Sequence, residues 1–230
     1  RKINWKATSR RKNLMINQFQ EEKSQMVYSL IDKSRVMRMP FEGLTLLDLS
    51  INSSLVFSNI VVNKGDKAGL LTFSDKIGQH VKASSRPQQV RLILETLYRQ
   101  KTEFNEVNYN TLYHGVRQFI RNRSMLMIYT NFESMYSLQR ALPAIRKLNR
   151  LHLVVIVMFE NTELVEISQQ ESYQMSDIYL KTIAEKSILE KRLMAQELAK
   201  YGIHCVLTPP KDLSVNTINK YLEVKSRGAL

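Results

Sequence analysis

An aspartate and a serine, spaced two residues apart, follow an apolar run near the start of the chain. The run is Val27–Ile31, and Asp32 and Ser34 come after it. In open α/β sheets, ligand groups lie where a loop leaves the carboxyl end of a strand. A carboxylate with a nearby hydroxyl suits a hard cation such as Mg²⁺ or Mn²⁺. The next position in this spacing is Val36, which offers no ligand. The pattern therefore predicts an incomplete metal site.

A second interpretation of the same residues needs no metal. Asp32 can hydrogen-bond Ser34 or main-chain amides of the following loop, as aspartates do in turns. Lys33 and Arg35 add positive charge beside the carboxylate, which disfavours a divalent cation. In both interpretations the polar residues lie at the carboxyl edge of a sheet, which is a natural docking surface.

Side chains around this turn are candidates for contact with a partner. Met37 and Met39 follow it closely, and flexible thioether side chains adapt to varied surfaces. His114 belongs to a later segment that we expect beside the turn. We expect Lys33, Arg35, Met37 and His114 to form a partner-binding edge.

Other chemistry finds little support in the sequence. There is no Gly-x-Ser-x-Gly, Gly-x-Gly-x-x-Gly or Walker A pattern, which argues against a hydrolase, a dinucleotide fold and a P-loop. The four histidines are far apart and adjoin no nucleophile pattern. The single cysteine, Cys205, lies in an apolar run and is expected to be a packed thiol. We expect no enzymatic activity and no small-molecule substrate.

Alternating strands and helices would bring the candidate residues together. Apolar runs predict strands at residues 27–31, 68–73, 77–81, 125–129, 151–158 and around residue 205, with 77–81 running antiparallel. Helical periodicity predicts helices at residues 42–62, 87–97, 116–120, 135–148, 162–170, 177–201 and 217–224. This alternation indicates an α/β fold with a doubly wound, mostly parallel central sheet flanked by helices.

The amino-terminal segment differs from the rest in charge. Residues 1–23 carry seven Lys or Arg against two Glu, within a chain of 230 residues and net charge +13. We expect a basic segment at 1–23, with an edge strand at 14–19, and a main domain at 24–230. The charge suits an acidic partner, an anionic membrane surface or nucleic acid. Trp5 is more simply a packing anchor than a base-stacking platform, so nucleic acid is the less favoured partner.

No apolar run approaches the roughly 20 residues of a membrane span, and no signal peptide is visible. Because the chain begins in a basic segment without an initiator Met, we expect a domain from a longer protein.

Four stretches resemble a known family, in the same order. They are Ile3–Arg10, the strand with Asp32 and Ser34, Gly65–Phe73 and Tyr221–Leu230. Over its whole length the chain resembles the MoxR-associated, von Willebrand factor A-like proteins catalogued as domain of unknown function fifty-eight. The resemblance implies an adaptor through which a MoxR-type AAA+ ATPase acts on a client protein. It also implies the cytoplasmic domain of a membrane-anchored protein of the bacterial inner membrane.

The resemblance further implies a metal-ion-dependent adhesion site, built from Asp-x-Ser-x-Ser, a later Thr and a later Asp. The corresponding residues here are Asp32, Ser34, Val36, Asn108 or Thr111, and Asn131. Val36 supplies no ligand, and Asn131 supplies a neutral oxygen where a carboxylate is expected. The site is therefore expected to be degenerate, with either no metal or weakly bound Mg²⁺ or Mn²⁺.

Overall fold

Apolar runs bounded by polar turns form a six-stranded central sheet in the computed structural model. The structure describes residues 2–3, 16–17, 24–41, 43–102, 104–169 and 175–228. The sheet contains β3 (Met26–Asp32), β6 (Lys67–Phe73), β7 (Ile77–Ser84), β8 (Met125–Tyr129), β9 (Leu153–Phe159) and β10 (His204–Thr208). Their order is β10-β9-β8-β3-β6-β7, and all pairings are parallel except that of β6 with β7. The expected doubly wound, mostly parallel sheet is confirmed.

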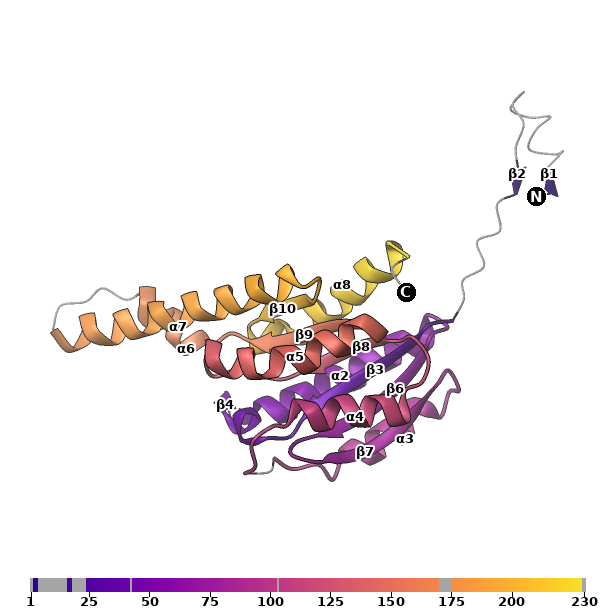
Figure 1. Ribbon diagram of the computed structural model, residues 1–230, viewed down its shortest axis with the longest axis horizontal. Coiled ribbons are helices and arrows are strands. Elements are labelled where there is room, and N and C mark those ends of the chain that lie inside the picture. Colours follow the sequence, from indigo (N-terminus) through magenta and orange to yellow (C-terminus); the bar gives the residue numbers. More distant parts are fainter. Residues whose placement is uncertain are drawn as a thin grey trace.

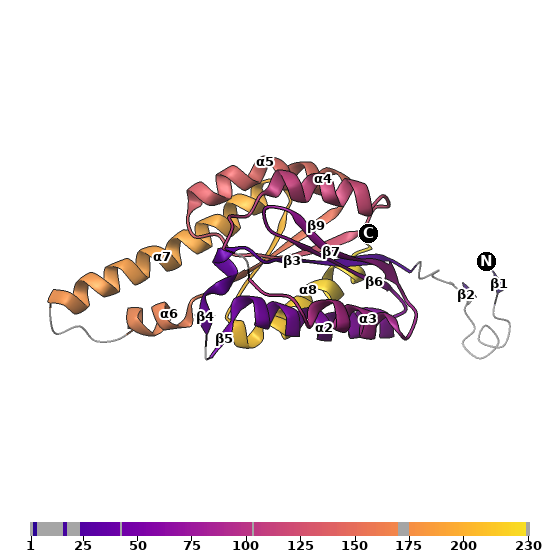
Figure 2. The ribbon, with the colours of Figure 1, turned by 90° about the horizontal axis from the view of Figure 1, so that it is seen from below.

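Helices cover both faces of this sheet (Figures 1 and 2). On one face lie α2 (Leu46–Asn63), α3 (Gln89–Leu97) and α8 (Leu213–Ser226). On the other lie α4 (Tyr109–Phe119), α5 (Met135–Leu151) and the inner part of α7 (Met175–Lys200). The outer part of α7 extends beyond the sheet beside α6 (Thr162–Gln169).

Each strand supplies side chains to both helical layers because successive residues point to opposite faces. In β3, Val27 and Ile31 join the core under α2, whereas Tyr28 and Leu30 join the core under α4 and α5. All four side chains are buried. The rigid, buried β3 therefore fixes the position of the residue at its end, Asp32.

The start of α2 differs from the expectation. The sequence predicted a helix from residue 42, but Pro40–Phe41 and Leu44–Thr45 pair as the short strands β4 and β5. The helix then begins at Leu46, where the Thr45 side chain and Asp48 form a reciprocal capping box.

Among the described residues, α2 is the one helix long and apolar enough to cross a membrane, with a mean hydropathy of 1.2. Its Leu47, Phe57 and Val61 side chains are buried in the core on the sheet. This packing is that of a core helix.

Most of the basic amino-terminal segment lies outside the described residues, including Trp5. Within it, β2 (Ile16–Asn17) pairs with β1 (Lys2–Ile3) as a separate two-stranded sheet. The described part of the expected edge strand therefore pairs with β1 and not with the central sheet. The division at residue 23 stays a prediction.

Candidate functional site

The candidate residues meet at the point where the strand order reverses. From the central strand β3, the chain first builds outward to β6 and β7 and then returns to β8 on the other side. Two neighbouring loops thus leave the carboxyl ends of β3 and β8 and diverge, which opens a crevice at this edge. Asp32 ends β3, and Thr130 and Asn131 directly follow β8.

Asp32 is fully buried, and both of its carboxylate oxygens accept hydrogen bonds. The Ser34 amide donates to Oδ1 at 2.8 Å, and Thr130 Oγ1 donates to Oδ2 at 2.7 Å. Tyr109 Oη lies 2.8 Å from Thr130 Oγ1 and extends the network toward α4. Burial raises the pKa of Asp32 to about 6, although the hydrogen bonds from Thr130 and Ser34 oppose that rise. The turn interpretation of Asp32 and Ser34 is confirmed in its geometry.

The Ser34 hydroxyl adjoins this network but makes no hydrogen bond with any described residue. It is buried and lines the crevice. The Ser34 side chain also lowers the pKa of the Asp32 carboxyl.

Asn108 and Thr111, the candidates for the threonine position, make no hydrogen bond with Asp32 among the described residues. Asn108 caps α4, because its Oδ1 accepts from the amides of Asn110 and Thr111 at 3.0 and 3.2 Å. Thr111 lies in the first turn of α4, outside the residues that line the crevice. The threonine that contacts Asp32 is Thr130. It directly follows an apolar strand, and that position was the signal that could have identified it.

Asn131 is bound by a lysine from the distant helix α7. Lys191 Nζ donates to Asn131 Oδ1 and, at 2.6 Å, to the Phe132 carbonyl oxygen. Burial lowers the pKa of Lys191 to about 8, so it is still mostly protonated at neutral pH. The adjacent Glu190 accepts from the Met135 amide at 2.7 Å. Through these bonds α7 is attached to the loop that follows β8, a contact that the sequence analysis missed.

The four residues of the expected partner-binding edge differ in exposure, and their role in binding stays a prediction. Arg35 is exposed and lines the crevice, and Lys33 is largely buried. Met37 is completely buried because the short helix η1 (Arg35–Arg38) turns it into the core, so its expected role at the surface is wrong. His114 is exposed on α4 but does not line the crevice.

These residues do not fit a divalent cation. Asp32 is the single carboxylate among the five expected ligand positions, and both its oxygens are engaged within the protein. The Asn131 oxygen is bound by an ammonium group, and Val36 is apolar. In the described part of the chain, no group of three or more His, Cys, Asp or Glu is placed to hold a metal ion.

Two adjoining pockets that share lining residues lie at this edge, and we call them together the edge groove. The first, of about 700 Å³, lies between the β3 loop and the amino-terminal ends of α4 and α5. The second, of about 440 Å³, extends toward β4, α6 and α7. The boundary between them is formed by the residues that line both: Arg35, Val36, Asn131, Phe132 and Glu133.

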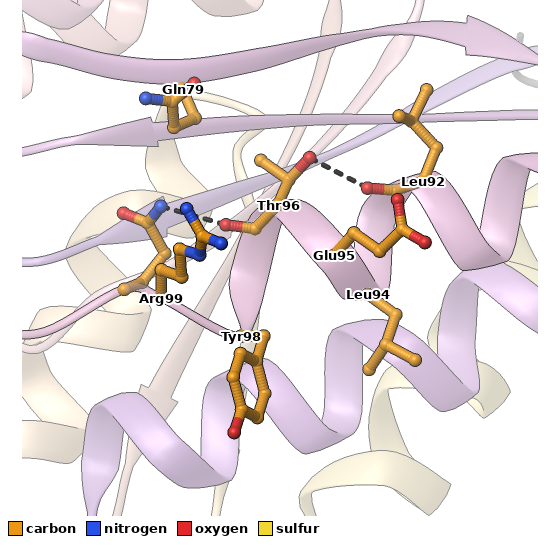
Figure 3. A pocket seen from close by; sticks show the side chains of 8 residues that line it. Gln79, Leu92, Leu94, Glu95, Thr96, Tyr98 and Arg99 are labelled. Atoms are coloured by element: carbon orange, nitrogen blue, oxygen red, sulfur yellow. Dashed lines mark hydrogen bonds between the residues drawn. The ribbon is translucent and has the colours of Figure 1, made fainter.

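Another pocket is lined by α3, by the residues that directly follow it and by Gln79 of β7, and it shares no lining residue with the edge groove (Figure 3). Two of its polar side chains bond to main-chain carbonyls of α3. Thr96 Oγ1 donates to the Leu92 carbonyl at 2.8 Å, and Gln100 donates to the Thr96 carbonyl at 2.9 Å (Figure 3). None of the candidate residues lines this pocket, so we place the candidate site at the edge groove.

The mostly parallel sheet in this strand order, with helices on both faces, is a von Willebrand A-like fold. Similar solved structures include BatB, a conserved hypothetical protein from Bacteroides thetaiotaomicron, with a TM-score of 0.55 and 14% identity over 87% of this chain and 100% of that one. An aerotolerance-related membrane protein from Bacteroides fragilis gives 0.50 and 14%, over 86% and 100%. The VWA domain of SpRpn10 gives 0.48 and 13%, over 85% and 94%. For the two Bacteroides structures, the likeness at 14% identity concerns the fold alone.

The chain belongs to the family described as "Protein of unknown function DUF58", whose model matches residues 1–192. The match covers most of the chain and ends within α7, one residue beyond Lys191. A comparison with curated proteins gives no significant match.

Proposed function

We propose that this chain is a non-enzymatic adaptor that docks a MoxR-type AAA+ ATPase through the edge groove, without a divalent cation. The observation that carries the proposal is the groove itself. It lies at the switch point of a von Willebrand A-like domain, between loops held on rigid strands. A groove of this kind is suited to a protein partner, because loops carried on a rigid scaffold are frequent sites of recognition.

The arrangement of reactive groups supports a role in binding rather than catalysis. Asp32 has a pKa near neutrality, but it lies beneath the groove with both oxygens hydrogen-bonded. Burial raises the pKa of Cys205 to about 12, which keeps that thiol protonated and a poor nucleophile.

The degenerate metal site forms part of the proposal. A complete adhesion site would need additional oxygen ligands around Asp32, yet Lys191 binds the oxygen of Asn131. In this chain, hydrogen bonds from Thr130 and Ser34 hold the turn where a cation would otherwise organise it. The groove is therefore shaped by the protein alone, and a partner is bound by side chains.

The cellular setting follows from the same proposal. The similar Bacteroides fragilis structure is described as a membrane protein. We propose that this chain is likewise part of a membrane-anchored bacterial protein and faces the cytoplasm, where an AAA+ ATPase and its client are accessible. The alternative of a nucleic-acid or anionic-membrane binder depends on residues 1–23, most of which lie outside the described residues.

Binding of a purified MoxR-type ATPase to the whole chain tests the proposal. We expect saturable binding in EDTA that Tyr136→Ala weakens about ten-fold or more, because exposed aromatic side chains in grooves are frequent hot spots. Tyr136 lines the first pocket and is 69% exposed. The control, Tyr98→Ala, removes an 85% exposed tyrosine directly after α3 and should leave binding unchanged.

Two results of this experiment would contradict the proposal. One is the absence of ATPase binding both in EDTA and in Mg²⁺. The other is an equal effect of Tyr136→Ala and Tyr98→Ala, which would place the contact away from the groove.

A further inference from the structure

The edge groove is acidic, although the chain as a whole is strongly basic. Five carboxylates and three basic groups line its two pockets, which gives a net lining charge of −2 on a chain of net charge +13. The acidic residues are Asp75, Glu106, Glu133, Glu160 and Glu163, and the basic residues are Arg35, Arg140 and Lys191. The net charge of the groove lining is thus opposite in sign to the net charge of the whole chain.

Two of the three basic groups are already paired within the protein. Lys191 donates to Asn131 and to the Phe132 carbonyl oxygen. Arg35 Nη2 lies 3.6 Å from Glu106 and 3.5 Å from Glu133, with about half of its side chain exposed. Ion pairs this exposed contribute little, so a basic group of a partner can replace Arg35 at either carboxylate.

The two pockets also differ in chemical character. The first is lined mainly by polar and charged side chains, together with the amino-terminal turns of α4 and α5. The second contains an apolar group of side chains: Met39, Pro40, Phe41, Leu46, Phe159 and Pro210. Met39 is 46% exposed, so part of this apolar surface is open to solvent.

We infer that the edge groove receives an extended protein segment in which a lysine or arginine lies near an apolar residue. The basic side chain would bind Glu106 and Glu133 in place of Arg35, and the apolar residue would fill the second pocket. The inference rests on the proposed docking function and specifies the chemistry of the partner. A divalent cation would instead favour a carboxylate from the partner, so the preferred charge is a consequence of the altered site.

The positive charge elsewhere on the molecule sharpens this preference. Like charges repel a basic segment from other parts of the surface, whereas the groove attracts it, so the field directs the segment to one place. An acidic segment would be attracted to many places and held at none of them in particular.

Synthetic peptide pools test the inference on the complete chain, with fluorescence anisotropy in EDTA as the readout. One pool fixes Lys and Leu two positions apart among random residues, and a second replaces that Lys by Glu. We expect the Lys pool to bind and the Glu pool to bind several-fold more weakly. Glu133→Gln should weaken binding of the Lys pool roughly two- to five-fold, as expected for one exposed charge pair.

A matched control separates a local effect from a change in overall charge. Glu95 on α3 is 59% exposed and pairs with Arg91, whereas Glu133 is 58% exposed and pairs with Arg35. Glu95→Gln removes the same charge outside the groove and should leave binding of the Lys pool unchanged.

Preference for the Glu pool, or equal effects of Glu133→Gln and Glu95→Gln, would overturn the inference. These outcomes are distinguishable from failure of the proposed function. If the ATPase binds and Tyr136→Ala weakens it while the pools show no preference for Lys, the docking function stands and the partner's chemistry is wrong. Selective binding of the Lys pool by a chain that binds no ATPase would support the groove chemistry and contradict the proposed partner.

Discussion

Two buried aspartates lie at opposite ends of the parallel sheet. One of them is paired with a cation and the other is not. Asp66 directly precedes β6 at the amino end and is 1% exposed. It accepts hydrogen bonds from the Gln25 amide and from Lys225 Nζ, each at 3.0 Å, and from the Tyr221 hydroxyl. Asp32 ends β3 at the carboxyl end, and its described partners are a hydroxyl and an amide, with no cation.

This difference indicates that the amino edge of the sheet contributes to stability, whereas the carboxyl edge is the candidate for recognition. At the amino end, an ammonium group and a phenol from α8 neutralise and satisfy the carboxylate, so the last helix is fastened to the sheet. At the carboxyl end, the charge of Asp32 is left without an ionic partner beneath an open groove. The cost of burying that charge appears as its raised pKa.

The largest expected effect is at the amino end. Asp66→Asn removes the charge that Lys225 pairs with and weakens the bond from Tyr221, so the free energy of unfolding should fall by about 2–4 kcal/mol. Urea unfolding followed by circular dichroism measures this change. An unchanged free energy of unfolding would mean that α8 is not fastened by this carboxylate.

At the carboxyl end, by contrast, neutralising the aspartate should raise the free energy of unfolding. Because the pKa of Asp32 is about 6 in the folded chain and 3.8 as its ordinary value, the carboxyl stabilises the fold when protonated and loses this contribution as pH rises through about 6. Asp32→Asn keeps a neutral group at every pH. It can accept from the Ser34 amide and donate to Thr130.

At pH 8 this variant should therefore be more stable than the native chain by about 1–3 kcal/mol, and the difference should vanish below the ordinary carboxyl pKa of 3.8. Urea unfolding across this pH range provides the measurement. A variant that is less stable at pH 8 would show that the ionised carboxylate is favoured in the native chain, as it would be beside a cation.

The positions of the core strands could be predicted closely, because the apolar runs that indicate them are local features of the sequence. The apolar run Met125–Tyr129 has the same bounds in sequence and structure, since Ser124 and Thr130 end it on both sides. The start of α2 was displaced because apolar periodicity continued through the β4–β5 hairpin. Thr45 and Asp48 carry the capping-box spacing, which is the better signal for that boundary.

The site was predictable only in part, because half of it depends on distant packing. Asp32, Ser34 and Asn131 follow strand ends and are brought to one edge by the parallel topology. Lys191 lies 60 residues beyond Asn131 on a helix whose local sequence gives no sign of this contact. Met37 was misplaced for the same reason, since it is buried in a core cluster with Leu46 and Leu47 of α2.

Titration of Mg²⁺ and Mn²⁺ by calorimetry tests the central claim, that this edge is shaped without a divalent cation, most directly. The native chain should show no saturable binding. The double variant Asn131→Asp with Lys191→Met, which supplies a second carboxylate and removes the ammonium, should gain weak binding; circular dichroism checks that it is folded. Saturable binding by the native chain that Asp32→Ala abolishes would contradict the account.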